Sequence, residues 1–133
     1  MTFHLTLADV KTKGLKALNE GRLSAQGPKP ECMYRDEDGR PCVVGAALSE
    51  DLINKLDDGS QIYAAVSKLW VLGLIKIPDG EYEPINRLQK VHDRWAQVVG
   101  GTVHPDQRLG SQPDLWGLDA EALERKLREE LSA

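Results

Sequence analysis

Cysteine, basic charge and long apolar runs are all scarce in this chain of 133 residues. Its 2 cysteines are too few for a secreted scaffold held together by several disulfides. Its 17 Lys and Arg are outnumbered by 21 Asp and Glu, so the net charge of −4 lacks the basic excess that binding to nucleic-acid phosphates requires. No apolar run approaches the roughly 20 residues that cross a bilayer. We therefore expect neither a nucleic-acid-binding protein nor a membrane protein.

What the chain does contain is typical of one globular domain. Hydrophobic residues make up 41% and charged residues 29% of the sequence, which is ordinary for a soluble domain of this length. The stretch from Met1 to Leu18 is interrupted by Asp9, Lys11 and Lys13, where a signal peptide needs an unbroken apolar run. We expect a single domain over 1–133 in the cytoplasm, with frayed ends at 1–5 and 132–133.

Apolar residues recur at helical spacing in several segments. The clearest is the segment after Pro84, where Ile85, Leu88, His92, Trp95 and Val99 step by three and four residues before Gly100-Gly101 ends the pattern. Capping residues mark other helix starts. The sequence predicts helices over about 7–20 (capped by Thr6), about 50–56 (capped by Ser49), from Ser60 to Gly73, and after Asp119.

A turn sequence, Asp38-Gly39, separates two short segments that are compatible with strands. It predicts an antiparallel β-hairpin with strands at 31–35 and 40–44, and a further brief strand is expected over Leu74 to Ile77. The predicted fold class is therefore α+β, mostly helical, with one small antiparallel hairpin. The loop over 102–117 is longer than usual, so it is functional, ordered by Trp116, or mobile.

The two cysteines, Cys32 and Cys42, flank the hairpin turn and allow several interpretations. The length of the loop decides whether their side chains lie on the same face of the hairpin. A disulfide is therefore compatible with the sequence but not implied by it. They fit small buried thiols, or Cys42 could be a nucleophile near a helix start with His92 as its base. Cys32, Cys42, His92 and His104 could also supply zinc ligands, but their spacing is not that of a zinc site. We predict no metal and no cofactor.

Polar residues gather at two further places. Gln89 and Asp93 are four residues apart on the predicted helix and could hydrogen-bond beside His92. Asp36, Glu37 and Asp38 concentrate negative charge at the tip of the hairpin.

Two motifs and a tryptophan stand in a fixed order along the chain. They are Cys32-x-Tyr34-Arg35, Asp38-Gly39-Arg40 and Cys42-Val-Val-Gly45 in the first, Leu88-Gln89-x-x-His92-Asp93 in the second, and Trp116. On these residues the chain resembles a family of uncharacterised phage, prophage and bacterial proteins over residues 31–48 and 85–118. The resemblance implies that the hairpin and the helix form one structural unit, with Cys42 or Tyr34 close to His92, and it implies no specific activity.

Two functions follow as hypotheses. The first is a non-enzymatic accessory protein of phage or prophage type, acting in the cytoplasm of a bacterial host by binding a protein. A basic host protein fits the acidic surface. The second is a small cysteine-dependent hydrolase or transferase that uses Cys42 and His92. The candidate binding residues are Tyr34, Asp36, Glu37, Asp38, Gln89 and Asp93.

Overall fold

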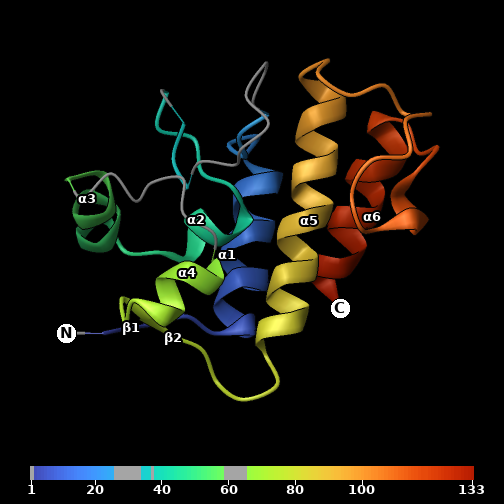
Figure 1. Cartoon of the computed structure of the whole chain (residues 1–133). Coiled ribbons are helices and arrows are strands. Elements are labelled where there is room, and N and C mark those ends of the chain that lie inside the picture. Colours follow the sequence, from blue (N-terminus) through green and yellow to red (C-terminus); the bar gives the residue numbers. More distant parts are fainter. Residues whose placement is uncertain (1, 26–33, 37, 59–65) are drawn as a thin grey trace.

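The computed structural model describes residues 2–25, 34–36, 38–58 and 66–133, and this part of the chain is mostly helical (Figure 1). Within it, no helix is both long and apolar enough to cross a bilayer. The elements in chain order are β1 (Phe3–His4), α1 (Leu7–Asn19), α2 (Val43–Ala47), α3 (Glu50–Asp58), α4 (Val66–Val71), β2 (Ile75–Lys76), α5 (Tyr82–Val99), the 3-10 helix η1 (Pro113–Leu115) and α6 (Ala120–Ser132).

Helices α1, α5 and α6 form the main body of the fold. Helix α1 packs against α2 and α6, and α6 packs against α5, which stands beside it in Figure 1. Gly14 lies where α1 meets its neighbours. A Cβ there would lie 3.1 Å from Leu131 Cδ2 and 3.4 Å from Val43 Cγ1. The glycine that weakens the helical pattern in the sequence therefore allows close packing of three helices.

Several predicted helix starts are confirmed by their capping bonds. Thr6 Oγ1 accepts a hydrogen bond from Asp9 N at 3.1 Å, and Ser49 Oγ accepts one from Leu52 N at 3.2 Å. At α6, Asp119 Oδ1 accepts one from Ala122 N at 2.8 Å. The helix predicted from Ser60 is described only from Val66 onward, and Ser60 itself lies outside the described residues.

The apolar face of α5 is buried as the sequence predicts. Ile85, Leu88, His92 and Trp95 are all at most 8% exposed, and they pack into the common core. Val99 departs from the prediction and is 46% exposed, because α5 ends there and its last turn projects beyond the other helices.

The sheet differs from the prediction. It has two parallel strands, with Phe3 opposite Ile75 and His4 opposite Lys76. The expected antiparallel hairpin is reduced, in its described residues, to one bridge between Arg35 and Pro41. Pro41 has no N–H to donate, which limits the ladder there, and positions 31–33 are outside the described residues.

Described residues near both chain ends, where fraying is predicted, belong to secondary-structure elements or to the core. Phe3–His4 forms β1, and Leu5 is completely buried. Ser132 is the last residue of α6, and its Oγ donates to Arg128 O at 2.7 Å.

Candidate functional site

The segment containing Tyr34 crosses directly over Gly45. A Cβ on Gly45 would lie 2.0 Å from the carbonyl oxygen of Tyr34, so no larger residue fits there. Arg35 stabilises the crossing, because its Nη1 donates to the carbonyl oxygens of both Gly45 and Tyr34. Its Nη2 forms an ion pair with Glu50 at 2.9 Å. Tyr34, Arg35 and Gly45, which are separate parts of the sequence motif, therefore meet at this one crossing.

Cys42 caps α2 and has no exposed surface. Its Sγ accepts a hydrogen bond from Gly45 N at 3.3 Å. The preceding residue, Pro41, accepts a hydrogen bond from Ser24 N at 2.8 Å, which holds the 23–25 segment against the turn. Cys32 lies outside the described residues, so the relation between the two cysteines stays a prediction.

His92 is 1% exposed and lies in the same region as Cys42. Its Nε2 is 3.0 Å from the carbonyl oxygen of Ser24, which can only accept, so Nε2 carries a proton. Its Nδ1 is 3.5 Å from Asp93 Oδ1. The imidazole is therefore held between a backbone acceptor and a carboxylate, an environment that suits its protonated form.

Two opposing influences act on the pKa of His92. Burial alone lowers the pKa, but the contact with Asp93, the electrostatic effect of Cys42 and the Ser24 carbonyl together outweigh it. The result is a pKa raised above the ordinary value for histidine. The imidazole therefore takes up a proton at a higher pH than a free histidine does.

Gln89 and Asp93 form the hydrogen bond that their spacing predicts. Gln89 Nε2 donates to Asp93 Oδ1 at 2.8 Å, and Gln89 Oε1 accepts from Val44 N at 3.2 Å. Gln89 therefore ties α5 to the first turn of α2. The polar cluster at the edge of the α5 apolar face joins the two motifs into one structural unit.

The acidic tip is largely committed to its own turn. The carboxylate of Asp36 accepts hydrogen bonds from Ser24 Oγ at 2.8 Å, Asp38 N at 2.9 Å and Arg40 N at 2.8 Å. Asp38 is exposed, and Glu37 lies outside the described residues. Tyr34, another candidate binding residue, is only 4% exposed and belongs to the core.

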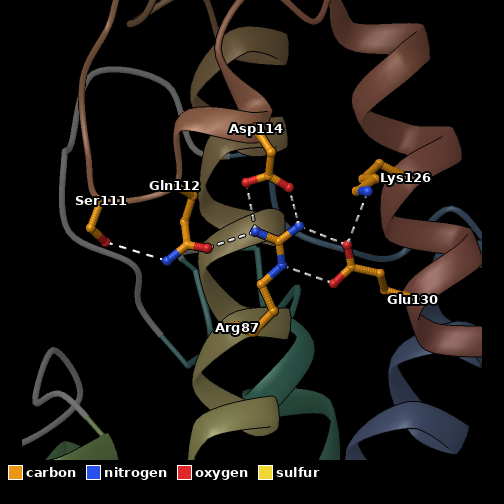
Figure 2. A network of polar contacts seen from close by, with 6 residues as sticks. All are labelled: Arg87, Ser111, Gln112, Asp114, Lys126 and Glu130. Carbon is orange, nitrogen blue, oxygen red and sulfur yellow. Dashed lines mark hydrogen bonds and ion pairs between the residues drawn. The ribbon is translucent and has the colours of Figure 1, made fainter.

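Arg87 is the centre of an ion-pair network that joins α5, α6 and the long loop (Figure 2). Its Nε and Nη2 donate to Glu130 at 2.9 and 2.8 Å, and its Nη1 and Nη2 donate to Asp114 at 3.0 and 2.7 Å. Nη1 also donates to Gln112 Oε1 at 2.6 Å. These bonds raise the pKa of Arg87 and lower the pKa of Asp114. The network fixes η1 and the loop segment before it.

Arg94, two turns further along α5, holds the other end of the same loop. Its Nη2 donates to the carbonyl oxygens of Pro105 at 3.0 Å and Gln107 at 2.7 Å. The residue is 5% exposed, and its Nε and Nη1 are buried without a hydrogen-bond partner among the residues that the structure describes. Burial lowers the pKa of this guanidinium.

A cavity of about 150 Å³ lies between α5 and the loop. Lys90, Asp93, Arg94 and Gln97 line it from α5, and Leu109 and Ser111 are among the loop residues on its other side. Trp116 orders this part of the loop by donating from Nε1 to Leu109 O at 2.8 Å. The sequence singled out the loop and Trp116, but not Arg87 or Arg94. The available signal was two arginines seven residues apart on the helix that precedes a long loop.

Within the described residues, no three His, Cys, Asp or Glu side chains are grouped so that they could hold a metal ion. His104, one of the four residues considered as zinc ligands, is exposed, and its Nδ1 accepts from Asp106 N at 3.2 Å. Comparisons with protein-family models, curated proteins and solved structures found no match.

Proposed function

We propose that this chain is a non-enzymatic accessory protein of phage or prophage type that acts by binding another protein. The observation that carries the proposal is an apolar ridge of three consecutive residues, Trp70, Val71 and Leu72. They are 42%, 87% and 51% exposed. Single exposed apolar residues are common, but adjacent ones that include a tryptophan are typical of binding surfaces.

The apolar ridge is held in a fixed conformation before any partner arrives. The ring of Trp70 packs on Tyr82, at the start of α5, with 5.6 Å between ring centroids. Gly73 ends α4 with a positive φ of 75°, and the hydrogen bonds Gly73 N to Trp70 O and Leu74 N to Leu69 O close the turn. A rigid surface loses little conformational entropy on binding, which favours affinity.

The partner that fits this ridge is a protein with an apolar pocket and an acidic rim. Lys68 is exposed and precedes Val71 by three residues, so it lies beside Val71 on the helix surface. The acidic tip supports the alternative of a basic host protein less well, because Asp36 is used internally and Asp38 alone is exposed among its described carboxylates.

The second hypothesis, a cysteine-dependent hydrolase or transferase, has less support. The structure brings Cys42 and His92 into one region, but neither has more than 1% exposed surface. His92 Nε2 is also engaged by Ser24 O, which occupies this nitrogen in this conformation.

The test is affinity capture from nuclease-treated host lysate with a matched set of variants. We expect wild type to retain a specific protein, and the double variant Val71→Ser with Leu72→Ser to retain at least tenfold less of it. Val99→Ser is the control, because Val99 is 46% exposed and ends α5, whereas Trp70 contacts Tyr82 at the start of that helix. If the double variant retains as much of the protein as wild type does, the apolar ridge is not the binding surface. Loss of capture by Asp38→Asn alone would move the binding site to the tip.

A further inference from the structure

We propose that the cavity beside Arg94 binds a small monoanionic group of carboxylate type. The inference goes beyond the protein-binding function proposed above and uses a different surface. The apolar ridge lies at the end of α4, whereas this cavity lies between α5 and the 102–117 loop.

The first observation is the incomplete hydrogen bonding of Arg94. A guanidinium has five N–H donors, and Arg94 uses only those of Nη2, on Pro105 O and Gln107 O. Nε and Nη1 are buried without an acceptor. Arg87, seven residues earlier, has two carboxylates and an amide oxygen as partners. A buried charged donor without an acceptor is costly, so Arg94 is matched to an acceptor that the described residues do not supply.

The second observation is the size and charge of the cavity that Arg94 lines. Its volume of about 150 Å³ is smaller than the roughly 300–1,000 Å³ of sites for drug-sized ligands. Lys90 and Arg94 contribute positive charges and Asp93 a negative one, which leaves one net positive charge. A carboxylate balances this charge, whereas a phosphate dianion would bring excess negative charge close to Asp93.

The third step concerns access to the guanidinium. Because Nε and Nη1 are shielded, binding at these donors requires the 105–112 segment to shift outward. The segment is held to α5 by the two Arg94 Nη2 bonds near its start and by the Arg87 bond to Gln112 at its end. Its Leu109 side chain, at the cavity wall, is 53% exposed. Binding therefore perturbs both the Arg94 side chain and the loop backbone.

The test is an NMR titration of the ¹⁵N-labelled full chain with sodium acetate, against sodium chloride and sodium phosphate at equal ionic strength. We expect acetate to shift the Arg94 Nε–H signal and the amide signals of 106–112 with saturation, and phosphate to bind more weakly. Identical shifts with chloride and acetate would overturn the site. Tighter binding of phosphate would overturn its selectivity for a monoanion.

Variants locate the binding to the cavity. Lys90→Gln should weaken acetate binding about two- to fivefold, as expected for one partly exposed charge contact. Lys68→Gln makes the same charge change on α4 and should leave acetate binding unchanged. Arg94→Gln should abolish it, and if that variant does not fold, the Lys90→Gln titration decides. Unchanged affinity in Lys90→Gln would contradict the assignment. The Val71→Ser, Leu72→Ser variant should bind acetate normally, so failure of one proposal leaves the other testable.

Discussion

Arg87 and Arg94 lie two turns apart on α5 and hold the two ends of one loop. Arg87 bonds Gln112 and Asp114, whereas Arg94 bonds the carbonyl oxygens of Pro105 and Gln107. The first arginine is fully paired, whereas Nε and Nη1 of the second have no hydrogen-bond partner within the described part of the chain. Both arginines thus anchor the loop, and Arg94 also has the donors on which the proposed carboxylate site rests.

Loss of the Arg87 side chain should destabilise the fold. Arg87→Met leaves Glu130 and Asp114 without their main partner, and we expect it to lower the free energy of unfolding by about 1–3 kcal/mol. Arg87→Lys keeps the charge but not the paired geometry, so it should fall between wild type and Arg87→Met. Urea denaturation measures both. Lys126→Met is the control, since Lys126 contacts Glu130 only at 3.8 Å. A lysine variant as stable as wild type would show that charge alone suffices.

The stabilisation due to His92 should depend on pH. Because its pKa is raised in the folded state, the extra stability is complete below the unfolded pKa of about 6.5 and is lost as pH rises through the folded pKa. The difference in unfolding free energy between wild type and His92→Gln should therefore shrink as pH rises above 6.5. Asp93→Asn, which removes the main group that raises the pKa, should reduce this pH dependence. A constant difference from pH 6 to pH 9 would be incompatible with a raised pKa.

Replacing Gly45 with alanine should be far more harmful than replacing Gly14. The new methyl group at position 45 would meet a backbone oxygen at 2.0 Å, and we expect a loss of about 3 kcal/mol or more. At position 14 it would meet the flexible end of Leu131 at 3.1 Å, and alanine gains about 1 kcal/mol of helix propensity. Gly14→Ala should therefore change stability by less than about 1 kcal/mol. Thermal unfolding of both variants compares them, and equal effects would refute the close crossing at Tyr34.

Cys42 should react slowly with thiol-directed reagents in the native protein. It has no exposed surface, so modification requires local or global opening. We expect labelling of Cys42 at pH 6, located by peptide mass spectrometry, to be at least a hundredfold slower without denaturant than with it. Fast native labelling would instead support the enzyme hypothesis, in which Cys42 is an accessible thiolate.

The sequence predicted the features that depend on local chemistry. The caps at Thr6, Ser49 and Asp119, the buried face of α5 and the Gln89–Asp93 bond all follow from spacing along one helix. Each involves residues within a few positions of one another, so propensity and periodicity were sufficient.

Features that join distant segments could not be predicted. The pairing of Phe3 with Ile75 has no local pattern, because a two-residue strand is too short to show alternation. The partners of Arg87 lie on the following loop and on α6, and the spacing of Arg87 and Arg94 on one helix does not say which distant segments they contact. For the same reason the sequence does not show that Asp36 is occupied, since its hydrogen bonds come from Ser24 as well as from its own turn.

The contact of Gly14 with Leu131 has a consequence for synthesis on the ribosome. One face of α1 can be covered by α6 only after nearly all of the intervening chain has been translated. At roughly 5–20 residues per second, that delay lasts on the order of 6 to 23 seconds. During this time α2 can already pack against α1. The part of the apolar face of α1 that α6 later covers stays exposed, so chaperones can bind it or it can aggregate. Slower translation before α6 should therefore lower the soluble yield without changing the stability of the finished protein.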